Sequence, residues 1–290
     1  MAVRPEGMKV GIIANPNKPG AVRAYGRLVG ALGQRGIESQ VDRETAALVG
    51  GEGLPGPELA QASDLVVVLG GDGTMLHAVA TLGGTETPMA GVNIGTLGFL
   101  TSCTDDELEE FAEALKNGSF HVSKRTMLAA TVVRSDGRTK EYLALNEAVL
   151  ARGQTGRLVS MKATVDGDLL NRYRADGLIV ATPTGSTAYS LSAGGPLISP
   201  AADVFVITPI CPHTLSQRSL VIDDTTEIEL APDGLEEGAL LFTVDGRDCD
   251  EIGALDRVKI RKDARSLNLV RLEGRSFYGA LRQKLNWRGG

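Results

Sequence analysis

Short apolar runs and helical spacings alternate along the first hundred residues. The run Met8–Ala14 has the length of a strand and ends at an Asn-Pro pair. Across Ala21–Gln34 the apolar residues recur every three or four positions, which predicts an amphipathic helix that stops at Gly36. The run Leu65–Leu69 is apolar throughout, as expected of a strand covered on both faces of a parallel sheet. We therefore predict an α/β domain, with further strands near Ile37–Val41 and Met89–Asn93 and a Gly/Pro-rich loop before Asp64. A helix is expected over Asp105–Asn117. Thr104 and Glu107 form a capping box at its start, and Gly118 ends it.

After Gly118 the pattern changes to short β-type runs separated by Asp-Gly turns. This pattern predicts an antiparallel β-sandwich, with strands near Ala129–Val133, Ser160–Val165, Glu227–Leu230 and Leu240–Val244. The end of the chain, around Phe277–Trp287, has a helical pattern again. We expect a Rossmann-like α/β domain over 1–120, a β-sandwich domain that binds NAD over 121–270, and a C-terminal segment over 271–290 that packs on the first domain.

Composition and charge narrow the class of partner. The 290 residues carry 30 Lys and Arg against 36 Asp and Glu, so the net charge is −6 and no global basic field attracts nucleic acid or an anionic membrane. No apolar run has the length of a signal peptide core or of a membrane span. We expect a cytoplasmic protein that binds neither nucleic acid nor membrane. The 36 glycines exceed the usual share and cluster beside polar residues, which favours tight turns against a ligand.

The cysteines and histidines indicate neither a disulfide framework nor a metal site. Cys103, Cys211 and Cys249 are odd in number and widely spaced, which argues against a disulfide framework. Cys211 and His213 are near neighbours, but Pro212 between them fits an ordinary turn and no second ligand pair follows. We expect no protein-bound metal site.

The most informative local pattern is Gly70-Gly71-Asp72-Gly73-Thr74, between the apolar run and a helical pattern. Glycines let phosphate oxygens approach backbone N–H groups, and a helix start adds the positive end of its dipole. A carboxylate at Asp72 repels phosphate unless it holds a metal ion or accepts a proton from a nucleophile. The alternative is a simple strand-to-helix turn in which Asp72 is the N-cap.

Other patterns for nucleotide or acyl chemistry are weaker. The segment Gly51–Gly56 matches the dinucleotide pattern G-x-G-x-x-G, but no apolar strand precedes it and Pro55 and Pro57 argue against a following helix, so we expect a flexible loop. No lysine follows a glycine, which excludes a Walker A loop, and no G-x-S-x-G nucleophile elbow is present.

Two polar segments lie in the second half. Asp176–Ser190 begins as a strand and ends in a loop with glycine and six hydroxyl side chains, which suits a ribose and an amide-bearing ring, or else is a Ser/Thr-rich turn. The pair Asn146-Glu147 interrupts an apolar run. It has the chemistry to contact an adenine edge and a hydroxyl, although such a pair is more often the solvated face of a strand.

Together these segments resemble the NAD kinase family. Gly70–Thr74 is similar to its phosphate-donor and catalytic motif, Gly91–Leu100 to its next strand and loop, and Asn146-Glu147 to its dinucleotide-contacting pair. Arg174 with Asp176–Ser192 resembles the longest motif of the family. The resemblance covers nearly the whole chain in the family's order.

The resemblance implies an active site between the two domains. Asp72 becomes the general base for the 2′-hydroxyl of the adenosine ribose of NAD, which attacks the γ-phosphate of ATP complexed with Mg²⁺ or another divalent cation. The resemblance implies that Gly70, Gly71, Gly73 and Thr74 bind the phosphates of the donor. The resemblance further implies a homodimer or homotetramer. The positions implied to bind NAD are Asp72, Gly73, His77, Asn146, Glu147, Arg157, Arg174, Asp176, Thr187, Ala188, Tyr189, Ser190, Leu191, Ser192 and Arg247.

One position departs from the family pattern, and two rival functions remain. The family often has Asp-Gly-Gln where this chain has Asp245-Gly246-Arg247, so a cation replaces the expected amide and can face a phosphate. A lipid kinase shares the GGDGT turn, but the charge of −6 and the lack of a basic amphipathic helix give it no membrane attachment. A non-catalytic dinucleotide sensor needs the pocket but not Asp72.

Overall fold

The computed structural model describes residues 7–153, 158–214, 216–234 and 240–287, with the backbone alone at 248 and 249. The chain divides into two compact units. The first unit comprises Met1–Lys124 and Ser266–Gly290, and the second unit comprises Arg125–Arg265. Two long strands, β6 (Phe120–Val133) and β17 (Arg257–Leu272), contribute residues to both units.

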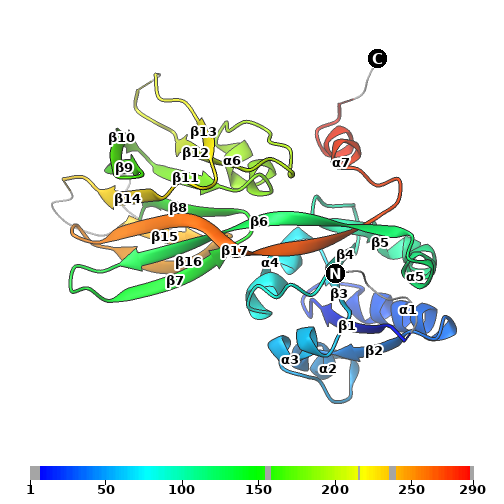
Figure 1. Cartoon of the computed structure of the whole chain (residues 1–290). Coiled ribbons are helices and arrows are strands. Elements are labelled where there is room, and N and C mark those ends of the chain that lie inside the picture. Colours follow the sequence, from blue (N-terminus) through cyan, green and yellow to red (C-terminus); the bar gives the residue numbers. More distant parts are fainter. Residues whose placement is uncertain (1–6, 154–157, 215, 235–239, 288–290) are drawn as a thin grey trace. The chain divides into compact units, whose positions relative to one another are not determined.

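The first unit contains a parallel sheet in the order β2-β1-β3-β4. Its strands are β1 (Lys9–Ala14), β2 (Glu38–Val41), β3 (Leu65–Gly70) and β4 (Met89–Asn93), and the short β5 (Thr101–Thr104) and the end of β17 pair in parallel with β4. Every residue of β3 is buried, as the continuous apolar run predicts. Figure 1 shows β1 and β2 side by side in blue.

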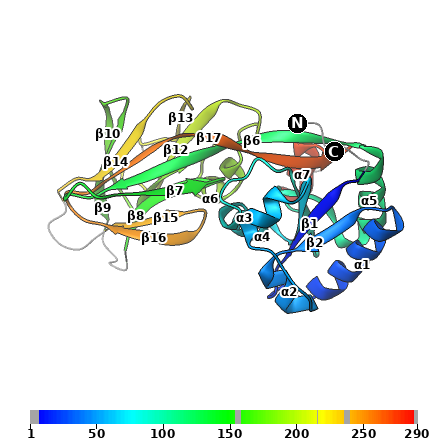
Figure 2. The same ribbon diagram turned by 60° about the horizontal axis from the view of Figure 1, so that its bottom comes forward.

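Helices cover both faces of this sheet. The apolar faces of α1 (Ala21–Gln34) and α5 (Leu108–Asn117) share a core with Leu65, Val67 and Leu69, and Figure 2 shows the two helices next to each other. On the opposite face Leu59 and Met75 contact the glycine positions of β1 and β4, so α3 (Gly56–Gln61) and α4 (Asp72–Thr81) lie there. The helix α7 (Phe277–Lys284) confirms the helical pattern expected near the C-terminus.

The segment between β2 and β3 corrects one sequence expectation. In place of an irregular loop it holds α2 (Arg43–Val49), which Asp42 caps through Thr45 N at 3.1 Å, and α3. Proline in the first turn of a helix lacks only an N–H that has no intrahelical partner, so Pro57 fits α3. The capping box is as predicted: Thr104 N donates to Glu107 Oε2 at 2.8 Å, although a 3₁₀ turn (Asp105–Glu107) precedes α5, and Gly118 ends α5.

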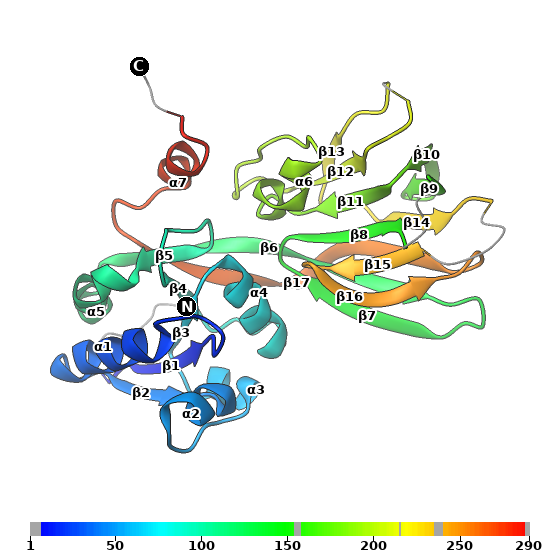
Figure 3. The same ribbon diagram turned by 180° about the vertical axis from the view of Figure 1, so that it is seen from behind.

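The second unit is a β-sandwich, as the sequence predicts. One sheet is formed by β10-β9-β14-β17 with β6 and β7, and the other has the order β13-β12-β11-β8-β15-β16. Figure 3 shows β15 and β16 beside β8, and the short α6 close to β11. The bounds are β7 (Thr139–Ala144), β8 (Glu147–Arg152), β9 (Val159–Val165), β10 (Asp168–Ala175), β11 (Gly177–Ala181), a 3₁₀ turn (Gly185–Thr187), α6 (Tyr189–Ser192), β12 (Val204–Ile210), β13 (Leu220–Asp223), β14 (Ile228–Pro232), β15 (Leu240–Val244) and β16 (Arg247–Ile252).

Alternate residues of both sheets fill the sandwich core, with Leu150, Leu178 and Phe242 from one sheet and Met161 and Ile260 from the other. The opposite face of β8, β11 and β12 is also covered, because Ile198 packs there with Val149, Ile179 and Val206. The segment after β11 therefore lies on the sheet, which explains why β11 is apolar at every position.

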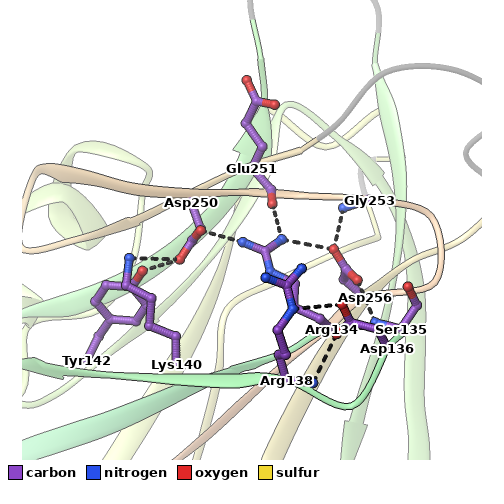
Figure 4. A network of polar contacts seen from close by, with 10 residues as sticks. All are labelled: Arg134, Ser135, Asp136, Arg138, Lys140, Tyr142, Asp250, Glu251, Gly253 and Asp256. Atoms are coloured by element: carbon purple, nitrogen blue, oxygen red, sulfur yellow. Dashed lines mark hydrogen bonds and ion pairs between the residues drawn. The ribbon is translucent and has the colours of Figure 1, made fainter.

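A charged network ties the β6–β7 hairpin to β16 within this unit (Figure 4). The Arg134 guanidinium bonds Asp250 and lies 2.9 Å from Asp256 Oδ2, while the Tyr142 hydroxyl also donates to Asp250. Asp256 in turn accepts hydrogen bonds from Ser135 N and Gly253 N at 2.9 and 3.0 Å. These bonds satisfy a cation and two carboxylates that are only partly exposed.

Among the described helices, none is both long enough and apolar enough to cross a membrane.

Candidate active site

The Gly70–Thr74 segment is a tight turn from β3 into α4. A Cβ on Gly70 would lie 2.2 Å from Thr74 Oγ1, so only glycine fits there. Thr74 Oγ1 accepts hydrogen bonds from Gly71 N at 3.3 Å and from Asn15 Nδ2 at 3.1 Å. The turn is thus fixed from both sides, while Gly73 is exposed at the start of the helix.

Asp72 does not cap the helix. Gly71 is the N-cap and Asp72 is the first helical residue, so the simple capping alternative is wrong. The half-buried carboxylate instead accepts two backbone hydrogen bonds, from Phe99 N to Oδ2 at 2.9 Å and from Leu100 N to Oδ1 at 3.0 Å. Both of its oxygens are therefore oriented by the loop that follows β4.

That loop belongs to the Gly91–Leu100 motif. Its shape is set by Gly95, with φ of +116°, by a bond from Asn93 Nδ2 to Thr96 O, and by a bond from Gly98 N to Thr101 Oγ1 at 2.7 Å. The motif thus supplies the donors that hold Asp72.

Arg271 near the end of β17 is a buried cation in the same unit that the sequence analysis missed. Its Nη1 donates to Thr101 O at 2.7 Å and its Nη2 donates to Phe99 O. Burial lowers the pKa of Arg271 to about 10, and the negative charge of Asp72 acts in the opposite direction. The only sequence signal was a single arginine inside the apolar run at the end of a strand.

His77 lies on the exposed side of α4. Its Nε2 is 3.4 Å from Thr81 Oγ1, one turn further along the helix. This contact is local, so a ligand role for His77 stays a prediction.

In the second unit, Asn146 and Glu147 are buried, so the alternative of a solvated strand face is wrong. The carboxylate of Asp245 accepts hydrogen bonds from Leu145 N, Asn146 N and Glu147 N at 2.9, 2.8 and 3.1 Å. Asp245 takes a φ of +50° in the tight turn that the Asp-Gly pair predicts. The β15–β16 turn thereby fixes the start of β8.

Glu147 has unusual electrostatics. It is 5% exposed, and its Oε2 has no hydrogen-bond partner within the described structure. Burial, followed by the charge of Asp245, raises the pKa of Glu147 to about 8, while a hydrogen bond with the Tyr189 backbone lowers it. A buried carboxyl oxygen without a partner is available to accept from, or donate to, a ligand hydroxyl.

The loop after β11 packs directly on this pair. A Cβ on Gly185 would lie 2.1 Å from Asn146 O, and Thr182 N donates to the same oxygen at 2.8 Å. Asn146, Glu147, Asp245, Gly185 and the Tyr189 backbone therefore come together, although they are spread over a hundred residues.

Most hydroxyls of this loop bond within the protein. Thr182 donates to Leu145 O at 2.6 Å, Ser186 to Pro183 O at 2.7 Å, and Thr187 to Thr184 O at 3.1 Å, while Ser190 Oγ lies 3.0 Å from Thr208 Oγ1. The expectation that these hydroxyls serve a ligand is wrong for the fully buried Thr182 and Ser186, which shape the loop instead. The remaining positions of the motif differ in exposure: Tyr189 and Ser192 are exposed, and Ala188 and Leu191 are half-buried.

The cations of the second unit occupy several places. Asp176 Oδ1 lies 2.8 Å from Nε of Arg152, a partner that the sequence analysis did not name. Arg174 is exposed on β10, and Arg247 is exposed at the start of β16. Burial raises the pKa of Asp245, and the charge of Arg247 acts in the opposite direction. Arg157 lies outside the described residues.

The described residues contain no cluster of three or more His, Cys, Asp or Glu side chains that could hold a metal ion. Cys103 is buried, which raises the pKa of its thiol, and Cys211 is exposed with a φ of +44°. Both are free cysteines.

Comparison with known proteins gives the family. The ATP-NAD kinase N-terminal domain matches residues 56–120, and the ATP-NAD kinase C-terminal domain matches residues 145–272. The chain is 41% identical over 279 residues to the NAD kinase of Geobacter metallireducens, covering 96% of this chain and 98% of that protein. It is also 41% identical over 278 residues to the NAD kinase of Solibacter usitatus, covering 96% of each.

Two solved structures have the same fold. Yeast NADH kinase complexed with NADH superposes with a TM-score of 0.89 at 26% identity, covering 98% of this chain and 89% of that one. An NAD kinase from Archaeoglobus fulgidus in complex with ATP superposes with a TM-score of 0.75 at 25% identity, covering 97% of this chain and 100% of that one. With both domains matched in order and full-length relatives at this identity, the chain belongs to the ATP-NAD kinase family.

Proposed function

We propose that this protein transfers the γ-phosphate of ATP to the 2′-hydroxyl of the adenosine ribose of NAD, forming NADP and ADP. A bond forms between the ribose 2′-oxygen and the γ-phosphorus, the bond from that phosphorus to the β,γ-bridging oxygen breaks, and the hydroxyl proton leaves to a base. The reaction class follows from the family, and the two solved relatives are complexes, one with NADH and the other with ATP.

Asp72 is the proposed base, and the geometry of its carboxylate is the observation that supports the assignment. Two N–H groups orient its oxygens beside glycines at the start of α4. A fixed carboxylate within reach of the acceptor hydroxyl contributes both orientation and proton acceptance to phosphoryl transfer.

Gly70, Gly71, Gly73 and Thr74 are the proposed donor site. The first N–H groups of α4 have no intrahelical acceptors, and the dipole adds positive potential for the phosphates of ATP. The divalent cation is proposed to arrive as part of the ATP complex, where it neutralises the charge that develops on the phosphates.

The proposed contacts with NAD lie largely in the second unit. Glu147 has a free buried oxygen for a ribose hydroxyl, Asn146 offers an amide, and Arg247 offers an exposed cation suited to a phosphate. The proposal extends to the other positions of the motif, from Arg174 and Asp176 to Thr187–Ser192, and to His77 and Arg157.

A direct assay tests the function. The purified chain is given NAD or NADH with ATP or polyphosphate, each with and without Mg²⁺, and the phosphorylated dinucleotide is measured. Turnover with NAD and ATP is expected. Dinucleotide binding without any turnover would indicate the non-catalytic sensor, while the family assignment already argues against a lipid kinase.

We also propose a cytoplasmic homodimer or homotetramer. Light scattering coupled to gel filtration measures the mass of the assembly, and a monomer at micromolar concentration would contradict the proposal.

A further inference from the structure

Arg271 and Asp72 are connected through a single peptide group. The peptide that joins Phe99 to Leu100 receives the Arg271 guanidinium at its carbonyl oxygen and gives its N–H to Asp72 Oδ1. The Phe99 N–H, one peptide earlier, binds the other oxygen of the same carboxylate at 2.9 Å. Because a peptide group is planar, a guanidinium that fixes the carbonyl also fixes the direction of the N–H.

The setting of Arg271 makes this arrangement more than a surface contact. The residue is 8% exposed, and no carboxylate within the described residues lies at ion-pair distance from its guanidinium. A buried cation is costly unless its donors are satisfied and a compensating charge is near. Here the acceptors are the carbonyls of Phe99 in the loop and of Thr101 at the start of β5, and Asp72 supplies the interacting negative charge. Hydrogen bonds in such a chain polarise one another, so the guanidinium strengthens the N–H bond to Asp72.

The two carbonyls explain why the residue is an arginine. Nη1 reaches Thr101 O and Nη2 reaches Phe99 O, so the fork spans the loop on either side of Leu100. A lysine has one ammonium group at the end of a flexible chain and cannot reproduce this planar, two-armed geometry.

We propose that Arg271 is a positioning residue for the phosphoryl transfer: by holding the Phe99–Leu100 peptide, it orients the Asp72 carboxylate toward the acceptor hydroxyl. It touches neither substrate in this proposal and acts only through the loop. The inference rests on the proposed role of Asp72 as the base.

The test uses Arg271→Lys and Arg271→Met in the full chain. With the carboxylate misplaced, kcat should fall by about tenfold in Arg271→Lys and by about 10²-fold in Arg271→Met, since small misplacements of reacting groups have costs of this order. The KM values for NAD and ATP should change by less than about threefold, because no binding group is lost. Arg275→Lys is the matched control. Arg275 follows β17 in the same unit but pairs with Glu107, so the kcat of this variant should equal that of the wild type.

A double-mutant cycle separates positioning from general stability. Once Asp72→Asn has removed the base, Arg271→Lys should cause little further loss of kcat, whereas a purely structural effect should multiply with that of Asp72→Asn. Circular dichroism and thermal unfolding establish that each variant is folded, and Arg271→Gln, which keeps a neutral donor, replaces Arg271→Met if that variant is unfolded.

The outcomes are distinct. A wild-type enzyme without turnover would refute the proposed function itself. An active wild type with unchanged kcat in folded Arg271→Lys, or independent losses in the cycle, would overturn the positioning role and leave the function intact.

Discussion

Gly98 lies against the Asp72 carboxylate so closely that a Cβ on Gly98 would be 2.1 Å from Asp72 Oδ1 and 2.9 Å from Oδ2. The nearest atoms to that Cβ all belong to the carboxyl group. The loop therefore wraps the carboxylate with backbone alone, giving N–H groups from Phe99 and Leu100 and leaving no room for a side chain at Gly98. The glycine in this motif is explained by the approach of Asp72.

Gly98→Ala should displace the carboxylate or the loop. We expect kcat to fall by about 10²-fold, the order of loss that accompanies a misplaced catalytic group. The matched control is Gly30→Ala in α1, where a Cβ has open space and alanine favours the helix, so activity should be unchanged and stability should rise by about 0.5–1 kcal/mol. Steady-state kinetics on both variants measure the contrast, and equal activities would show that the loop adapts without moving Asp72.

Asp72→Asn should lose most of the rate while keeping the fold. General-base assistance is worth about 10²–10⁴ in rate, so kcat should fall by that order. The structure adds a second reason, because each oxygen of Asp72 takes one N–H bond and an amide can replace only one of the two acceptors. Calorimetry should show NAD binding close to that of the wild type. A loss of less than about tenfold would remove Asp72 from the base role.

The sequence predicted those features that depend on local pattern. The helical spacing gave α1 with both of its ends, and the continuous apolar run gave β3 within one residue of its bounds. It did not reveal β5, because Thr101–Thr104 is four residues of mostly hydroxyl side chains with no apolar alternation. It placed a loop where α3 forms, because the prolines were interpreted as helix breakers although one of them lies in the first turn.

The parts of the site that escaped prediction depend on contacts between distant residues. Arg271 reaches the loop around Phe99 across about 170 positions, and no spacing rule connects them. For Asn146-Glu147 the sequence left a solvated strand face open as the alternative to a ligand contact. The pair is buried because Asp245, a hundred residues further on, satisfies its backbone N–H groups. A carboxylate that replaces ladder hydrogen bonds leaves no periodic signature in the sequence.

Arg247→Ala should weaken NAD binding and spare the chemistry. The side chain is exposed after a tight turn, in the position where the family often has glutamine, so its contact with the dinucleotide is expected to be the same in the ground and transition states. The signature is a raised KM for NAD with kcat at saturation nearly unchanged. Arg138 is an exposed arginine of the same unit that pairs with Asp136. Arg138→Ala is therefore the control, and its KM for NAD should equal that of the wild type. An unchanged KM in Arg247→Ala would place the residue on the solvated surface.

Glu147 should make stability depend on pH in a direction opposite to that of an ordinary paired carboxylate. Its pKa is raised to about 8 in the folded chain by burial and by Asp245, while in the unfolded chain it is that of a free glutamate, about 4.3. Between these values the folded state binds the proton that the unfolded state has lost. The stability from this group is therefore fully present below the unfolded pKa and is lost as pH rises toward 8.

Glu147→Gln removes that titration and keeps the size of the side chain. We expect the free energy of unfolding of the variant to increase relative to that of the wild type from pH 5 to pH 9, by up to about 1.4 kcal/mol for each unit of pKa difference, because only the wild type loses stability over this range. Urea denaturation of the ligand-free chain at pH 5, 7 and 9 measures the two curves. Glu141→Gln, at an exposed glutamate of β7, serves as the control and should follow the wild type at every pH. Parallel curves for Glu147→Gln and the wild type would mean that Glu147 is ionised in the folded chain at neutral pH, and its buried oxygen would then have to meet the dinucleotide as an acceptor alone.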